Sequence, residues 1–165
     1  MSHHDIEPLE PVAWLTALDH LTRQTPRGEE ALVRALRRAF HLVQLAPRPL
    51  RHVLASSATE ADFEGFLAKG ALLQAVEALV GEGLGSGMRT TAAGEVRAEV
   101  RFIDGTASAE ASAPSAALAL FAAWSECLRN LIQTDPAAGE AGASGATSPD
   151  RRKSRSEPHP RLTEH

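Results

Sequence analysis

The chain has 165 residues, a net charge of −4, one cysteine and no tyrosine. This length suits one domain with an appendage, and the small net charge gives no general attraction to nucleic acid or to an anionic membrane. The single cysteine, Cys127, excludes an intramolecular disulfide and a zinc site built on several cysteines. Its apolar helical surroundings predict a buried structural thiol.

The amino-terminal segment carries no targeting or membrane signal. Its first residues, MSHHD, are polar and acidic, unlike a secretion signal. No apolar run in the chain approaches the ~20 residues that a membrane span needs. We therefore expect a cytoplasmic protein without membrane association, and a flexible segment over residues 1–10.

An α-helical hairpin region is predicted over residues 11–55. Pro11 suits the first turn of a helix, because the N–H that proline lacks would have no partner there. Thr25-Pro26 repeats this start signal, and apolar residues recur at helical spacing after both. The segment APRP at 46–49 closes the hairpin, and a short helical turn is expected after it.

The next helical segment, from residue 56 to residue 80, is predicted in two parts. Ser57 and Glu60 have the spacing of a capping box, in which each side chain binds a free backbone N–H of the first turn. Gly70 interrupts the helical pattern, and an apolar part follows it. The sequence GEGLGSG (residues 81–87) lacks the Lys-Ser/Thr pair of a phosphate-binding loop, and we interpret it as a flexible connection.

From residue 88 the hydrophobic period changes from 3.6 to 2, which predicts a three-stranded meander. The expected strands lie near residues 88–92, 95–103 and 106–112. Ala93-Gly94 and Asp104-Gly105 are the predicted turns, and Asp-Gly is a strong signal for a two-residue hairpin loop.

The last helix is predicted from Ala113-Pro114-Ser115 to about Ile132, with the best amphipathic pattern in the chain. Residues 134–165 consist almost entirely of small, polar and charged residues and prolines. Such a composition buries too little apolar surface to offset the entropy of ordering, so we expect a disordered tail there.

These elements predict an α+β fold. Its core is a two-layer sandwich over residues 56–133, in which a three-stranded antiparallel β-meander carries helices on one face in the order α-β-β-β-α. The α-helical hairpin precedes it. The sequence GEVRAEVRFIDGTASAEASAPSAALALFAAWSECL resembles the small phage-associated domain known as the phage ABA sandwich. The resemblance covers about residues 71–132 and implies a phage- or mobile-element-like domain without known catalytic residues.

The Asp104-Gly105 turn sets the register of the last two strands. A two-residue loop pairs Ile103 with Thr106, and it places the apolar residues of both strands on one side. A slip of one residue would move every side chain to the other face of the sheet, so this agreement supports the register.

The other side of this hairpin is predicted to place Glu99 opposite Glu110, with Arg97 and Arg101 on the diagonals. Two facing carboxylates could share a proton or bind a cation. The two arginines, however, would neutralise the carboxylates and repel a metal ion. We interpret the four residues as a solvated ion-pair network on the open face of the sheet, and as its hypothetical binding site.

A basic helix offers the alternative site. Arg34, Arg37 and Arg38 lie within a basic segment from Arg27 to Arg51, and they are the candidates for contact with phosphates. No aromatic stacking residue or glycine-rich phosphate loop accompanies them, which disfavours nucleic acid. The start of the last helix, SAPSAALAL, also lacks the lysines with which double-stranded RNA-binding domains hold phosphates.

The sequence therefore predicts a small non-enzymatic interaction module with no cofactor and no metal site. Its partner would be another protein or a second copy of the chain. The alternative is an accessory regulator that contacts nucleic acid through the Arg27–Arg51 helix and the basic tail RRKSR. An enzyme that uses Glu99 and Glu110 as its carboxylates is the least favoured hypothesis.

Overall fold

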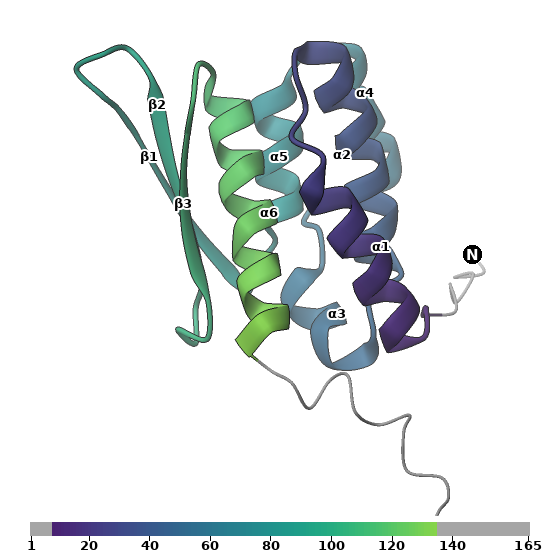
Figure 1. The fold of residues 1–165 in the computed structure, drawn as a ribbon. Helices are drawn as coiled ribbons and strands as arrows, with labels where there is room; N and C mark the ends of the chain where they lie inside the picture. Colours follow the sequence, from purple (N-terminus) through teal and green to yellow (C-terminus); the bar gives the residue numbers. More distant parts are fainter. Residues whose placement is uncertain (1–7, 135–165) are drawn as a thin grey trace, which may run out of the picture.

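The structure is a computed structural model that describes residues 8–134 (Figure 1). The described part contains helices and a single three-stranded antiparallel sheet of order β1-β2-β3. The elements are α1 (Pro11–Arg23), α2 (Glu29–Gln44), α3 (Arg48–Leu54), α4 (Glu60–Ala68), α5 (Leu72–Val80), β1 (Leu84–Thr90), β2 (Val96–Phe102), β3 (Ser108–Ala113) and α6 (Ala116–Thr134). The predicted α+β fold class, with a meander and helices on one face, is confirmed.

The helical hairpin is formed by α1 and α2, which pack against each other. Pro11 occupies the first turn of α1, as predicted. The buried Trp14 indole of α1 donates a hydrogen bond of 2.7 Å from Nε1 to the Leu42 carbonyl oxygen of α2. Ahead of α1, the Leu9 N–H donates to the Leu45 carbonyl oxygen at 3.0 Å, so the chain is held to α2 from residue 9 onward.

Helix α4 begins at a different cap from the predicted one. Thr59 is the N-cap, and its Oγ1 accepts from the Asp62 backbone N–H at 3.2 Å. The prediction that Ser57 and Glu60 form the capping box is wrong, because Thr59 caps the helix two residues later and its hydroxyl donates to Asp62 Oδ2 at 2.6 Å. Gly70, with φ +69°, separates α4 from α5 as predicted.

Strand β1 begins inside the glycine-rich segment. The predicted strand at residues 88–92 and the flexible connection at 81–87 are therefore wrong in their bounds. Leu84 pairs with Phe102, and the Ile103 N–H donates to the Gly83 carbonyl oxygen at 3.1 Å. Pairing with β2 thus overrides the weak strand preference of glycine.

The register of β2 and β3 is confirmed. Ala98 lies opposite Ala111, and Glu99 lies opposite Glu110. The loop is longer than predicted, because the Ile103 N–H binds β1 and does not pair with Thr106. Phe102 and Ala107 instead close a loop of four residues, 103–106. This loop is centred on Asp104-Gly105 like the predicted one, so the register is unchanged.

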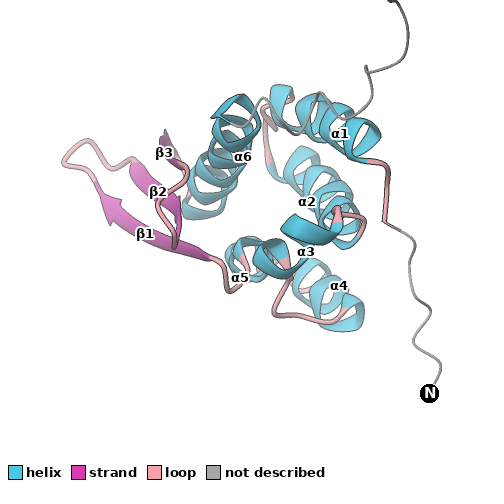
Figure 2. Ribbon diagram, turned by 90° about the horizontal axis from the view of Figure 1, so that it is seen from below, coloured by secondary structure: helices cyan, strands magenta, loops and turns pink. Residues whose placement is uncertain are grey.

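The sheet is covered on one side only (Figure 2). Helix α6 lies across β2 and β3 and contacts α5 and α1 on its other flanks. The side chains of Val100, Phe102 and Trp124 are almost fully buried between the sheet and the helices. Helices α1 and α2 pack behind α5 and α6, so their buried residues join those of the sheet in a single core cluster.

Candidate functional site

The open side of the sheet carries the four residues that the sequence analysis placed there. Arg97, Glu99 and Arg101 occupy every second position of β2 and face the same side, and Glu110 lies opposite Glu99 on β3. All four side chains are exposed, whereas the intervening residues Ala98 and Val100 are fully buried on the helix side. The strand alternation therefore separates a charged surface from the core, as predicted.

Glu110 is the centre of the ion-pair network on this side. Its Oε1 lies 2.9 Å from Arg89 Nη2 and 3.4 Å from Arg97 Nε. Arg101 makes no ion pair within the described residues, so only one of the two predicted arginines takes part. We refer below to the ion-paired Arg89, Arg97 and Glu110, together with the exposed Glu99 and Arg101 beside them, as the open-face network.

Arg89 is not among the predicted site residues, although it supplies the shortest ion pair of the network. The length of the loop between β1 and β2 decides on which side of the sheet Arg89 lies. In this loop the Thr91 N–H donates to the Glu95 carbonyl oxygen at 2.8 Å. Residues 92–94 form the turn, and Arg89 consequently lies opposite Arg97 on the open side. The signal was present in the sequence as Gly94, whose φ of +82° suits the last position of such a loop.

Four residues of the open-face network, Arg89, Arg97, Glu99 and Glu110, line a shallow hollow. The hollow has a volume of about 210 Å³ and lies over Gly87, which has no side chain to fill it. Glu99 opposite Glu110 gives the only facing carboxylates of the described strand ladder, and both are solvent-exposed. Among residues 8–134, no cluster of three or more His, Cys, Asp or Glu side chains could hold a metal ion.

The three arginines of the alternative site do not act together. Arg37 binds Glu64 of α4 through two nitrogens, with Nη2 at 2.7 Å and Nε at 2.9 Å from the carboxylate oxygens. These hydrogen bonds lower the pKa of Glu64 and raise the pKa of Arg37. Arg37 therefore links α2 to α4 and is not available to a ligand without breaking this pair.

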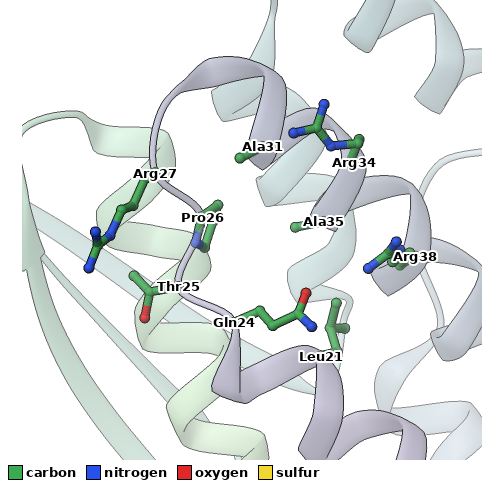
Figure 3. A pocket seen from close by; sticks show the side chains of 9 residues that line it. All are labelled: Leu21, Gln24, Thr25, Pro26, Arg27, Ala31, Arg34, Ala35 and Arg38. Atoms are coloured by element: carbon green, nitrogen blue, oxygen red, sulfur yellow. The ribbon is translucent and has the colours of Figure 1, made fainter.

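Arg34 and Arg38 instead border a groove with Arg27 (Figure 3). The groove lies between the end of α1 and the first half of α2 and has a volume of about 240 Å³. Arg34 and Arg38 project from one side of α2, and Arg27 projects from the loop that joins the helices. Arg34 lies 3.9 Å from Glu30, which is a weak, exposed pair. The rest of the lining is apolar at Leu21, Pro26, Ala31 and Ala35 and polar at Gln24 and Thr25.

Cys127 is the buried structural thiol that the sequence predicts. Its side chain is fully buried in α6, and its Sγ lies 3.6 Å from the Ala107 carbonyl oxygen. Burial raises the pKa of Cys127 to about 11, so the thiolate needed for nucleophilic chemistry is scarce at neutral pH.

Compared with models of protein families, with curated proteins and with solved structures, the chain gives no significant match. Within the described residues, none of the helices combines the length and the apolar character needed to cross a membrane.

Proposed function

We propose that the chain is a small non-enzymatic interaction module that binds a protein partner through the open side of its sheet. The observation that supports this proposal is the one-sided covering of the sheet. Helices bury one side, while the other side presents a charged surface at fixed positions on three paired strands. Binding residues on a rigid sheet need little ordering when a partner arrives, which favours recognition.

The pattern of charge on the open side defines the kind of partner. Glu99 and Glu110 form an acidic row, and Arg97 with Arg89 forms a basic row beside it. Arg101 lies on the other side of the acidic row and has no ion-pair partner among the described residues. A partner surface with alternating charge, and with a carboxylate at the position facing Arg101, would complement this arrangement.

The test compares two charge reversals in the cells from which the protein comes. Arg101→Glu changes the open side at a residue that forms no ion pair with the described part of the chain, so the fold should be retained. Lys69→Glu is the matched control, because Lys69 is an exposed residue at the end of α4. After chemical cross-linking and affinity purification, we expect specific proteins to be lost with Arg101→Glu and retained with Lys69→Glu. If both variants recover the same proteins in the same amounts, the open side is not the binding surface.

A second candidate function is contact with nucleic acid, and the groove in Figure 3 favours it. Arg27, Arg34 and Arg38 line a single groove and form no short ion pair among the described residues. A salt titration of binding to generic DNA, with wild-type protein and with Arg34→Ala/Arg38→Ala, tests this function. If the groove binds nucleic acid, the wild-type protein should bind DNA at low salt, and the double substitution should weaken this binding. The basic sequence RRKSR lies outside the described residues.

The proposal includes a cytoplasmic location and the relationship to phage ABA sandwich domains, both of which rest on the sequence. It excludes an enzyme that uses Glu99 and Glu110, because Glu110 is held by two arginines and both carboxylates are open to solvent. If the two glutamates belong to a solvated ion-pair network, Glu99→Gln/Glu110→Gln should fold with nearly unchanged or slightly improved stability, and a large loss of stability would contradict this interpretation.

A further inference from the structure

We propose that β1 pairs with β1 of a second copy of this chain. The two strands would run antiparallel about a two-fold axis at Gly87 and would join two sheets into one. This inference rests on the proposed function in taking the sheet as the binding element, but it uses the edge of the sheet and not its open side. It names a partner that the open-face network does not require.

The outer edge of β1 offers unpaired backbone groups. Thr91 and Gly83, which flank β1, use their inward-facing groups in hydrogen bonds with Glu95 and Ile103, which flank β2. Inward and outward positions alternate along an antiparallel strand. The N–H and C=O groups of Ser86 and Met88 therefore point outward. In Figure 2, β1 lies at the outer edge of the sheet, and no described element pairs with it there.

The opposite edge of the sheet is protected. Asn130 of α6 donates from Nδ2 to the Ser108 carbonyl oxygen at 2.9 Å, and α6 packs closely along β3. Natural proteins protect strand edges in this way, or with proline, bulges or charged side chains. Strand β1 (LGSGMRT) has neither proline nor bulge, and Arg89 is its only charged residue.

The side chains of β1 show the same asymmetry. Met88 shares the helix side of the sheet with its pairing partner Ala98. Ala98 is fully buried, but Met88 is 41% exposed, because α6 covers β2 and β3 and only touches β1. A strand added beside β1 would bring further side chains onto this uncovered surface and would bury Met88.

An axis at Gly87 pairs all seven residues of β1, since Gly87 is the midpoint of the strand. Met88 of each copy then lies opposite Ser86 of the other, and Arg89 lies opposite Gly85. No like charges face each other directly in this register. An axis two residues further along would place the two Arg89 side chains opposite each other, which is unfavourable on a sheet. The contact is isologous and closes at two copies.

Disulfide cross-linking tests both the contact and its register. The two Gly87 residues would occupy a non-hydrogen-bonded pair, with Cα atoms about 4.5 Å apart, which is within the range of a disulfide. A Cβ at Gly87 meets no atom within 4 Å, so Gly87→Cys is accommodated in the monomer. Gly85→Cys is the matched control, because the two Gly85 positions would lie about 13 Å apart.

Under mild oxidation we expect Gly87→Cys to form a covalent dimer at least tenfold faster than Gly85→Cys. Wild-type protein should not cross-link, because its cysteine is buried. Equal rates for the two variants would overturn the register, and a chain that sediments as a monomer at millimolar concentration would overturn the dimer.

Met88→Pro provides a second, independent test. Proline at this position removes an outward-facing N–H that has no strand partner among the described residues, so the monomer should retain its circular dichroism. Sedimentation equilibrium should show the dimer weakened at least tenfold, whereas Met88→Ala, which keeps the N–H, should weaken it less. A dimer unaffected by Met88→Pro would contradict the proposal. These measurements use purified protein alone, so their failure leaves the open-face proposal to its own test with Arg101→Glu.

Discussion

At the scale of single residues, the two tryptophans differ in one hydrogen bond. Trp14 donates its indole N–H to Leu42, but the Trp124 indole N–H has no partner within the described residues. Both side chains are almost completely buried. A buried polar group without a partner costs about 1–3 kcal/mol of stability. The indole N–H therefore stabilises the fold at Trp14 and destabilises it at Trp124.

We therefore expect Trp14→Phe to lower the free energy of unfolding more than Trp124→Phe does, by about 1–2 kcal/mol. Both substitutions remove similar ring volume, but only Trp14→Phe leaves a buried carbonyl oxygen without this donor. Denaturant titration followed by circular dichroism measures both values. Equal losses, or a larger loss for Trp124→Phe, would contradict the assignment.

How far single residues could be predicted depends on how far their partners lie along the chain. The sequence predicted on which side of the sheet Glu99 and Glu110 lie. This side follows from the alternation of side chains along a strand and from a turn only five residues away. The partners of Arg37 and Arg89 come from separate elements, at Glu64 and Glu110. Neither periodicity nor spacing relates such pairs, because they depend on how the elements pack.

At the scale of elements, β1 shows why a strand rich in glycine escapes prediction. Glycine is weak in strands, and the segment at 81–87 contains four of them. Close packing explains two of these, Gly81 and Gly83, since a Cβ at Gly81 would lie 2.8 Å from the Ala55 carbonyl oxygen. A Cβ at Gly83 would lie 2.4 Å from Val53 Cγ1 and 2.6 Å from the Val53 carbonyl oxygen. Only glycine lets α3 approach the start of β1 so closely, and no pattern in the sequence shows this contact.

Gly83→Ala should destabilise the fold by about 1–3 kcal/mol, because the added methyl group meets backbone as well as side-chain atoms. Gly87→Ala is the control in the same strand, and its effect should stay within about 0.5 kcal/mol. Thermal unfolding of dilute protein measures both. A tolerated Gly83→Ala would mean that α3 is not packed against β1 as described.

The pair of Arg37 and Glu64 should make the packing of α2 on α4 depend on pH. Hydrogen bonds from Arg37 lower the folded-state pKa of Glu64 below its ordinary value of 4.5. A carboxylate with a lowered pKa stabilises the fold above its unfolded-state pKa, and this contribution is lost as the pH falls through the folded-state value.

Wild-type protein should therefore exceed Glu64→Gln in unfolding free energy at pH 7, and the difference should disappear in acid. Because both side chains are nearly half exposed, the difference should be small and should decrease with salt. Arg34→Ala, which removes an exposed pair at 3.9 Å on the same helix, serves as the control. Unfolding curves at several pH values measure the difference in unfolding free energy between wild type and Glu64→Gln. A difference that persists below pH 3 would refute this role for Glu64.

At the scale of the whole molecule, the amino-terminal helices and the sheet share one core. Helix α6 contacts α1 on one flank and the sheet on another, and α2 packs against α5. The amphipathic stripe of α2 predicted that a face is buried, but a stripe does not name its partner. The sequence therefore indicated a helical hairpin over residues 11–55 without showing that it packs behind α5 and α6.

A shared core predicts that both parts unfold together. Trp14 lies in the hairpin and Trp124 in α6, and these are the two tryptophans of the chain. In Trp14→Phe the remaining fluorescence reports α6, and in Trp124→Phe it reports the hairpin. In each variant we expect the fluorescence and circular dichroism transitions to have the same midpoint, which is the signature of two-state unfolding.

Leu36→Ala makes this prediction sharper. Leu36 is fully buried in α2, and its truncation should cost about 2–5 kcal/mol. Because the hairpin and the sheet share one core, this substitution in the hairpin should shift the transition reported by Trp124 as far as the transition reported by Trp14. If the Trp124 transition stays in place while the hairpin unfolds at lower denaturant, residues 11–55 form a separate cooperative unit, despite their contacts with α5 and α6.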